Sequence, residues 1–401
     1  MHLKGGRSML LASDLISTPA FVYIEKIIQK KLHNIRKIQD CNILYPLKTC
    51  ALADVLRLMA PLNNGFSVSS LFEAMLAKDI AKKNNVIHIT TPGLRPDEIE
   101  NISELCDYIS FNSISQWKLY HSKLKSEIKQ GLRINPQLSF VKDDRYNPCR
   151  KQSKLGIPLT ELLHELNDIS SIKNISGFLF HTNCESTDFN DLLETVKHIE
   201  AYLPSALKKI SWINLGGGYL FDESENAEVL TETISLLKSR YELDIFIEPG
   251  NGTIRDAGYI VSSVIDLFKS DNRVIAVLDT TVNHMPEVFM YQYKPDIVGE
   301  SCNGKYKYIL AGASCLAGDI FGEYKFNQPL KIGNRIIFKS MGAYTLVKAN
   351  MFNGINLPSI YAYTLERELV LKRRFTYDDF ISRCVVKKNV VKRKKVCNSC
   401  S

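Results

Sequence analysis

The chain has 401 residues, 45% of them hydrophobic and 23% charged, which is the composition of a globular protein long enough for two domains. Its ten cysteines are scattered and no run of about 18 apolar residues occurs, which excludes a small disulfide-rich scaffold, predicts no membrane-spanning helix and favours the reducing cytoplasm. The net charge of +8 includes six basic residues within 385–401, so the remainder is nearly neutral.

Between about residues 20 and 250, short apolar segments alternate with longer amphipathic segments. The short segments indicate strands, and apolar residues spaced three or four apart indicate helices. Strands joined through helices pair in parallel by right-handed crossovers, so about eight such units predict an α/β fold, a (β/α)8 TIM barrel, over residues 18–255. The predicted helices are 25–38 and 71–80, and the predicted strands are 42–48, 86–90, 108–112, 131–135, 177–182, 211–218 and 245–250.

After residue 256 the apolar segments are separated by turns with few helices, which indicates an all-β domain. This domain is expected to comprise residues 256–384 together with 1–17. Its predicted strands are 259–268, 274–281, 306–312, 334–340 and 343–349.

The basic tail, residues 385–401, is predicted to be disordered. It lacks the aromatic residues that alternate with basic ones in many nucleic-acid-binding segments, so no nucleic-acid partner is expected. Cys397 and Cys400 form a CxxC without a second ligand pair, and no metal site is predicted. Whether Met1 or Met9 is the start is left open.

The active site of such a barrel lies at the carboxyl ends of its strands, so the polar residues there are the candidate site residues. They comprise a lysine, a histidine, a glycine-rich turn, a carboxylate and several amide or hydroxyl side chains. In chain order they are Lys48, Thr90, Thr91, Asn112, Asn135, His181, Gly216, Gly217, Gly218 and Glu248.

Lys48 ends an apolar strand, where desolvation would lower its pKa. A neutral lysine amine can form a Schiff base with a carbonyl substrate or with pyridoxal phosphate. For an isolated lysine, a solvated side chain at a strand end is the simpler interpretation. The other residues on the rim favour the functional interpretation.

The turn "NLGGGY", residues 214–219, could bind a phosphate through its backbone amides, although three glycines also suit a tight turn. It has neither the GxxxxGK[ST] nor the GxGxxG spacing, which argues against ATP and NAD. Glu248 ends an apolar strand and therefore requires a partner, either an internal cation or the pyridinium nitrogen of a cofactor. A carboxylate keeps that nitrogen protonated, which strengthens the cofactor as an electron sink. His181 is either a core histidine or a group that lies against a cofactor ring.

With these residues in place, the chain resembles the carboxynorspermidine/carboxyspermidine decarboxylases, pyridoxal-phosphate enzymes of the alanine racemase-like fold. The resemblance covers about residues 17–383, and its most specific part is Cys315–Tyr361. The motifs that carry it are "LYPLKT", "FHTNCE", "WINLGGGY", "EPGNG", "HMPEV", "GASCLAGDIFGEY", "YTLVKANMFNGINLPSIY" and "FTYDDFISR".

The resemblance implies a role for each matching residue, with pyridoxal 5'-phosphate as the cofactor. Lys48 would carry the cofactor as a Schiff base, and His181 would stack on the pyridine ring. The three glycines of the turn would hold the phosphate, Glu248 would face the ring nitrogen, and Tyr344 would reach the phosphate from the second domain. The residues assigned to the cofactor are thus Lys48, His181, Gly216, Gly217, Gly218, Glu248 and Tyr344.

The resemblance also implies a homodimer with shared active sites, in which Cys315 reaches the neighbour's site as a catalytic group. Asp319, with Glu323 near it, would meet a distal substrate amine, and Glu248 would lie beside the substrate. The implied reaction is decarboxylation of carboxynorspermidine or carboxyspermidine in polyamine biosynthesis. No membrane partner is expected.

Three departures from related decarboxylases are visible. Pro46 lies inside the predicted strand, where it would remove a ladder hydrogen bond. Asn251 replaces the arginine that many related amino-acid decarboxylases have after "EPG", and Asn283 replaces a cysteine before "HMPEV". The carboxynorspermidine decarboxylases also lack that arginine, so Asn251 favours this narrower group.

Two alternatives share much of this pattern. A diaminopimelate or ornithine decarboxylase would have the same cofactor residues and a different substrate pocket. A pyridoxal-phosphate-binding protein without catalysis would resemble the barrel alone, whereas this chain has about 130 further residues with Cys315, Asp319 and Tyr344. A racemase would favour arginine over Glu248 at the ring nitrogen.

Overall fold

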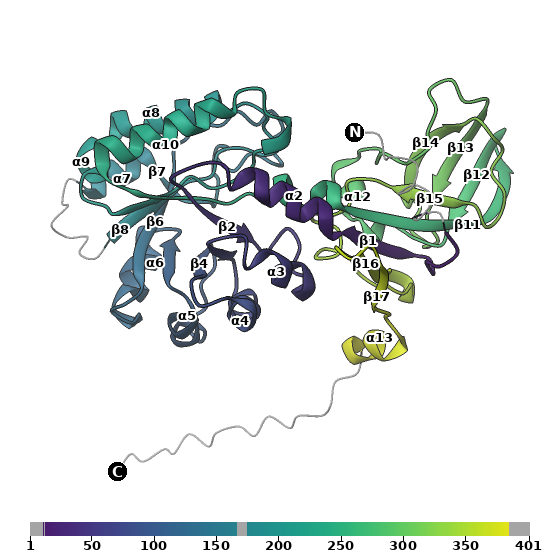
Figure 1. Ribbon diagram of the computed structural model, residues 1–401, viewed down its shortest axis with the longest axis horizontal. Helices are drawn as coiled ribbons and strands as arrows, with labels where there is room; N and C mark the ends of the chain where they lie inside the picture. The colour runs from purple at the N-terminus through teal and green to yellow at the C-terminus, as the bar shows by residue number, and fades with distance from the viewer. Residues whose placement is uncertain (1–10, 12, 167–174, 385–401) are drawn as a thin grey trace, which may run out of the picture.

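A closed barrel and a β domain lie side by side in the computed structural model, joined through helix α2 (Figure 1). The structure describes residue 11 and residues 13–166 and 175–384. The predictions made for residues 1–10 and for the basic tail, 385–401, concern residues outside this set. Within the described ranges, no helix has the length and apolar character needed to cross a membrane.

The barrel consists of eight parallel strands, closed by pairing of β10 with β2 and of β5 with β6. This confirms the predicted (β/α)8 architecture. The strand that the sequence did not reveal is β3, which has four residues and begins at a glycine. The strands are β2 (Asn42–Pro46), β3 (Gly65–Val68), β4 (Val86–Thr91), β5 (Tyr108–Phe111), β6 (Lys129–Asn135), β8 (Ile175–Leu179), β9 (Trp212–Asn214) and β10 (Asp244–Ile247), with the short β7 (Ile157–Pro158) beside β6.

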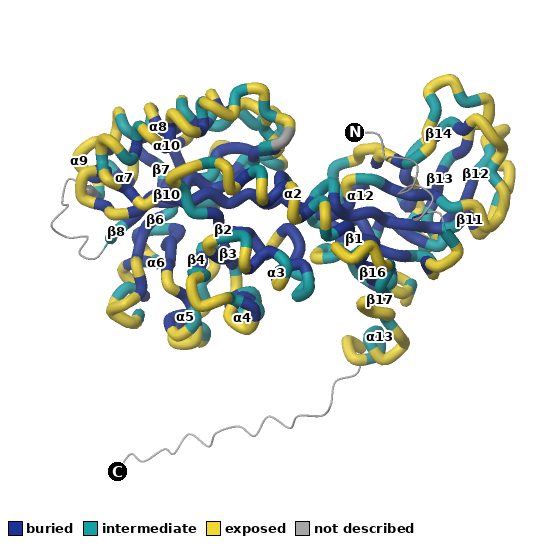
Figure 2. The backbone as a smooth tube through the Cα atoms, in the orientation of Figure 1, coloured by how far each residue is buried: buried dark blue, intermediate teal, exposed yellow. Residues whose placement is uncertain are grey.

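Helices surround the barrel with apolar faces inward and exposed faces outward (Figure 2). In α2, for example, Ile28, Leu32 and Ile35 recur at helical spacing and are buried. Two helices begin at serine N-caps: the Oγ of Ser70 accepts the Glu73 N–H in α4, and the Oγ of Ser113 accepts the Gln116 N–H in α6. The helices are α2 (Glu25–Ile35), α3 (Ala53–Met59), α4 (Leu71–Ile80), α5 (Ile99–Leu105), α6 (Ile114–Tyr120), α7 (Leu159–Leu166), α8 (Asn190–Tyr202), α9 (Pro204–Leu207), α10 (Ala227–Tyr241) and α11 (Asn251–Ile254).

The end of the barrel opposite the strands' carboxyl ends is filled by aromatic rings. Trp212 packs edge-on against Tyr108 and Phe246, with ring centroids 5.4 and 6.4 Å apart. Two glycines make room for the indole, because a Cβ at Gly131 or Gly177 would lie 2.5 or 2.0 Å from its ring atoms. This plug leaves the other end of the barrel for the site.

The β domain is built on one sheet in the order β14-β13-β12-β11-β1-β16-β17, with β15 also paired to β11. Four predicted strands are present at the expected places. The fifth, predicted at 343–349, is wrong: this segment is an irregular turn in which Tyr344 has φ = +54°. The elements are β11 (Gly258–Ser270), β12 (Arg273–Leu278), β13 (Tyr306–Ala311), β14 (Ile320–Phe326), β15 (Arg335–Phe338), β16 (Ser359–Tyr363), β17 (Leu369–Arg373), α12 (Glu287–Tyr291) and α13 (Tyr377–Cys384).

Strand β1 (Ala20–Ile24) belongs to this sheet, although it falls in the range predicted for the barrel. It pairs antiparallel with β11 and parallel with β16. Helix α2 follows β1 without a loop and packs on the barrel side, where Lys31 Nζ lies 2.6 Å from Asp256 Oδ2. The chain therefore starts the sheet, crosses to form the barrel and returns to complete the sheet.

Candidate active site

A cleft of about 1590 Å³ opens between the two domains at the carboxyl ends of the barrel strands. Its walls come from the barrel rim, from the loop between β6 and β7, and from α12 and the turn at 343–349 of the β domain. The residues on which its chemistry depends include Lys48, Arg133, His181, Glu185, Glu287 and Tyr344.

Lys48 lies in the turn that follows β2. Pro46 is the last residue of that strand, and its carbonyl accepts the Thr49 N–H at 3.2 Å and the Thr49 hydroxyl at 2.8 Å. The ladder continues past the proline, because the Leu47 N–H donates to the Ser67 carbonyl at 3.0 Å. Pro46 itself gives no donor to the ladder, and it begins the turn that presents Lys48.

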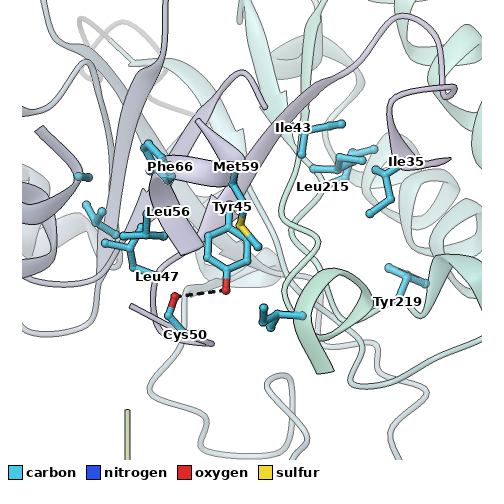
Figure 3. Packing of buried hydrophobic residues seen from close by; sticks show 14 of the residues in the cluster. Ile35, Ile43, Tyr45, Leu47, Cys50, Leu56, Met59, Phe66, Leu215 and Tyr219 are labelled. Atoms are coloured by element: carbon cyan, nitrogen blue, oxygen red, sulfur yellow. Dashed lines mark hydrogen bonds between the residues drawn. The ribbon is translucent and has the colours of Figure 1, made fainter. Parts of the chain in front are cut away.

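The core beneath this turn is rigidly packed. Figure 3 shows Tyr45 among Leu47, Leu56, Met59 and Phe66, with its hydroxyl donating to the Cys50 carbonyl at 3.3 Å. The Thr49 hydroxyl oxygen also lies 2.9 Å from the Tyr45 hydroxyl. These bonds fix the backbone on both sides of Lys48.

The Lys48 side chain is exposed within the cleft, but the surrounding walls remove bulk water from its ammonium. This desolvation lowers the pKa of Lys48, the Arg133 guanidinium lowers it further, and the Glu248 carboxylate opposes both. The net direction favours the neutral, nucleophilic amine.

The glycine turn follows β9, and the atoms around it leave no room for side chains at its three glycines. A Cβ at Gly216, Gly217 or Gly218 would lie 2.4, 2.0 or 2.1 Å from the carbonyl oxygen of Phe180, Glu248 or Asn183, respectively. Gly216 and Gly218 also have φ of +68° and +93°. All three positions therefore require glycine, because any side chain there would displace the turn from its neighbours.

His181 follows β8 and lies against the glycine turn. Its Nδ1 accepts the Gly217 N–H at 3.1 Å. Desolvation, together with the charges of Lys48 and Arg133, keeps the pKa of His181 well below its usual value. The ring is therefore neutral, with the proton on Nε2, and can lie against a flat, electron-poor ring.

Glu248 follows β10 and is buried, with 7% of its surface exposed. Its Oε1 accepts a hydrogen bond of 2.8 Å from the Asn214 amide. The same amide nitrogen lies 3.2 Å from His88 Nδ1, and His88 Nε2 lies 2.8 Å from the Ser110 hydroxyl. A chain of buried polar groups thus connects the barrel interior to Glu248.

The direction of this chain is determined by a backbone donor. The Gly216 N–H donates to Asn214 Oδ1 at 2.9 Å, so the Asn214 amide NH₂ must point at Glu248. Glu248 Oε1 therefore accepts, as a carboxylate does. The sequence did not reveal His88 or Asn214, because both lie inside apolar strands.

Tyr344 reaches the cleft from the β domain, as predicted. Its backbone N–H donates to the Thr49 carbonyl at 2.8 Å, and burial raises the pKa of its phenol. Three of the residues named from the sequence thus meet in one cleft, Lys48, His181 and Tyr344, and the glycine turn is bonded to His181 behind them.

Arg133 on β6 is a cleft residue that the sequence did not reveal. Desolvation lowers its pKa, and the Glu248 charge opposes that shift. The signal was available, because "GLRIN" places an arginine inside an otherwise apolar strand.

Two carboxylates, Glu185 and Glu287, also line the cleft. Burial raises the pKa of Glu287, the ion pair with Lys348 lowers it, and the Glu185 charge raises it. The Asn251 amide donates to Glu185 Oε1 at 2.6 Å. Glu185 thus has an uncharged partner, whereas Glu287 is paired with Lys348.

Three predicted residues do not join the cleft. Asp319 is 2% exposed; its Oδ1 accepts the Val282 N–H at 2.8 Å and its Oδ2 accepts the Ser314 N–H at 3.0 Å. Asp319 therefore organises its own loop, and both of its oxygens accept backbone N–H groups. Glu323 is paired with Arg273 on the sheet surface. Cys315 is exposed outside the cleft lining, with its N–H donating to Asn353 Oδ1 at 2.8 Å.

The other strand-end residues shape loops. Asn112 holds the loop before β7, donating to the Lys154 carbonyl at 2.8 Å and accepting the Gly156 N–H at 2.9 Å. Asn135 accepts the Gln137 N–H at 2.9 Å. Thr90 lines the cleft, Thr91 accepts the Gly93 N–H, and Asn283 is bonded to Thr281.

Comparison with known proteins gives a consistent result. The pyridoxal binding domain of pyridoxal-dependent decarboxylases matches residues 24–254. The carboxyaminopropylagmatine decarboxylase of Synechocystis sp. is 36% identical over 92% of this chain and 95% of its own. The carboxynorspermidine/carboxyspermidine decarboxylase of Herminiimonas arsenicoxydans is 32% identical over 92% of this chain and 99% of its own.

Solved structures agree. The carboxynorspermidine decarboxylase of Campylobacter jejuni, complexed with norspermidine, has a TM-score of 0.84 and 28% identity, covering 92% of this chain and 100% of its own. The diaminopimelate decarboxylase of Helicobacter pylori, complexed with L-lysine, has a TM-score of 0.81 and 20% identity, covering 95% and 100%, which is a likeness of fold.

Proposed function

The chain belongs to the pyridoxal-dependent decarboxylases, and on that premise we propose that it removes the carboxyl group of a carboxylated linear polyamine, carboxynorspermidine or carboxyspermidine. The products would be norspermidine and spermidine. Its cofactor is pyridoxal 5'-phosphate.

The residues of the cleft fit this cofactor. The glycine turn admits no Cβ, neutral His181 lies against it, and Lys48 offers a desolvated amine. Glu248 has one oxygen bonded to Asn214 and the other available for the ring nitrogen. When bound, the cofactor supplies an electron sink for the charge left by the departing carboxyl group. Glu248, held as an acceptor, would keep the ring nitrogen protonated.

The observation that carries the choice of substrate is the pair of carboxylates in the same cleft as Lys48. Glu185 and Glu287 offer negative charge to the ammonium groups of a polyamine. Diaminopimelate carries a second carboxylate at its far end, which Glu185 would repel and uncharged Asn251 could not pair. These two carboxylates are the partners that the cleft offers to ammonium groups, within a lining whose other charged residues are mostly basic.

A carboxylated aminopropylagmatine is the second candidate, favoured by the 36% identity to the enzyme of that name. Its guanidinium would be paired by the same carboxylates, in planar two-point contact where a primary amine makes a single contact.

The test is kcat/KM of the cofactor-loaded enzyme on five substrates: carboxynorspermidine, carboxyspermidine, carboxyaminopropylagmatine, diaminopimelate and ornithine. The first two should be preferred over the last two by at least about 100-fold, since each unpaired charge costs about 1–3 kcal/mol or more. Preference for diaminopimelate or ornithine would refute the substrate while leaving the cofactor unaffected. Preference for the agmatine derivative would select the second candidate.

The proposed assembly is a homodimer in which Cys315 acts in the neighbour's site. Its exposure outside its own cleft supports this arrangement. Mixing inactive Lys48→Ala and Cys315→Ala subunits should restore activity, because one site per heterodimer would be intact. If the subunits exchange and no activity is recovered, the active site must be formed within one chain. A cytoplasmic location is also proposed, and the free thiols at all eight described cysteines support it.

A further inference from the structure

Lys348 occupies a cage in the cleft that is built to hold an ammonium group. Its Nζ lies 2.6 Å from Glu287 Oε1, 5.0 Å from the centroid of the Tyr344 ring and 6.0 Å from that of Tyr291. A carboxylate combined with aromatic faces is a common protein site for an alkylammonium ion. We call Glu287, Tyr291 and Tyr344 the ammonium cage.

The cage is held from several directions. Tyr291 is stacked on Tyr146 with ring centroids 4.0 Å apart, and Tyr344 is tied to the Thr49 carbonyl. Glu287 belongs to α12, whereas Lys348 comes from the turn at 343–349. The two aromatic walls are therefore fixed by contacts other than Lys348, and Glu287 is carried by helix α12, so the long Lys348 side chain can leave without dismantling the cage.

The cage and Lys48 face the same cleft, and the proposed substrate carries ammonium groups beyond its reacting carbon. We propose that Lys348 fills, in the free enzyme, the position that a substrate ammonium takes in the complex. This inference rests on the proposed function, and it makes Lys348 a specificity-determining residue that acts as a tethered competitor. A substrate must exchange its own ammonium for that of Lys348, whereas an uncharged chain end cannot make this exchange.

The exchange predicts that removing the Lys348 charge strengthens polyamine binding. In Lys348→Met the cage is empty and keeps its carboxylate, so a triamine enters without displacing a cation. If Lys348 merely held Glu287 in place, the same change would weaken binding. If it bound the substrate carboxylate, triamine binding would not improve.

Lys294 provides a matched control. It lines the same cleft, is paired with Glu300, and lies 4.3 Å from the centroid of the Tyr324 ring. Lys294→Met therefore removes the same charge from a similar carboxylate and aromatic contact, but outside the ammonium cage. Comparing the two variants separates the displacement of Lys348 from the cage from a general gain in negative charge in the cleft.

The experiment is calorimetric titration of norspermidine and of spermidine into the full-length, cofactor-loaded protein. Wild type, Lys348→Met, Lys348→Gln and Lys294→Met are compared, each checked for cofactor content and melting temperature. Both Lys348 variants should bind the triamines at least about fivefold more tightly, because the substrate ammonium gains the ion pair and the aromatic contacts without displacing a lysine. The affinity of Lys294→Met should change by less than about twofold.

Unchanged or weaker binding in both folded Lys348 variants would overturn the inference, as would equal gains in the Lys294 variant. Either result leaves the proposed function standing if wild type binds the triamines. Failure of wild type to bind them would instead overturn the proposed substrate, and the inference with it. If one Lys348 variant does not fold, the other decides.

Discussion

The backbone N–H of Tyr344 donates a 2.8 Å hydrogen bond to the carbonyl of Thr49, the residue after Lys48. This bond joins the β domain to the turn that presents the lysine. Tyr344 adopts φ = +54°, an uncommon conformation for a residue with a side chain, and it brings the phenol into the cleft. The second domain therefore takes part in the site directly.

Tyr344→Phe tests the phenol separately from the backbone bond. The bond to Thr49 involves the main chain and should persist, so the melting temperature should change little. The loss of a hydroxyl contact to the cofactor phosphate should weaken pyridoxal phosphate binding by about 5- to 15-fold, the effect of about 1–1.5 kcal/mol. Fluorescence titration of the cofactor-free protein measures this. Unchanged affinity would remove Tyr344 from the phosphate site.

The rate at which cofactor-free protein attaches pyridoxal phosphate should rise with pH as Lys48 loses its proton. Because the pKa of Lys48 is lowered, the rise should occur below the pH at which an ordinary lysine titrates. Borohydride reduction followed by peptide mapping should place the label on Lys48, and Lys48→Ala should acquire none.

Two substitutions should shift this profile in opposite directions. Arg133→Met removes a cation that lowers the pKa of Lys48, so its profile should move to higher pH. Glu248→Gln removes an anion that raises the pKa of Lys48, so its profile should move to lower pH. Shifts of the same sign would contradict the charge arrangement of the cleft.

Gly217→Ala should damage the phosphate cradle. The new Cβ would lie 2.0 Å from the Glu248 carbonyl oxygen, so the turn or Glu248 must move. Cofactor affinity should fall by at least about 100-fold, since displacing the turn also displaces Glu248 and His181, which it contacts. Gly93→Ala is the control, because nothing lies within 4 Å of a Cβ there. Equal affinity in the two variants, measured by equilibrium dialysis, would show that the turn is not the cradle.

His88→Gln should reduce the sensitivity of the protein to acid. Burial lowers the pKa of His88 to about 3, so between that pH and about 6.5 the unfolded chain binds a proton that the folded chain does not. Stability should therefore fall with decreasing pH in this window, by up to about 1.4 kcal/mol per pH unit for this group. Glutamine can still accept from Asn214 and donate to Ser110 without titrating.

Chemical denaturation at pH 7.5 and pH 5 measures the difference. The loss of stability on acidification should be smaller in His88→Gln than in wild type. A loss of the same size in both proteins would mean that His88 is protonated in the folded state.

The residues that line up on the barrel rim could be found from the sequence because each is marked by local features. Lys48, His181 and Glu248 each end an apolar segment, and the glycines form one short run. In a parallel barrel the carboxyl ends of all strands lie on the same rim. Predicting the strands was therefore enough to predict that these side chains lie close together.

The features that only the tertiary structure decided depend on contacts between residues that are far apart in the sequence. Strand β1 reads as an apolar segment in either domain, and only pairing with residues 258–261 and 359–363 assigns it to the sheet. Asp319 could be taken for a free carboxylate until the backbone N–H groups of Val282 and Ser314 were seen to occupy it. The cage around Lys348 likewise joins α12 to the turn at 343–349. Ion pairs and ring contacts form wherever the fold brings side chains together, and they leave no periodic signal along the chain. The sequence alone therefore could not predict this cage.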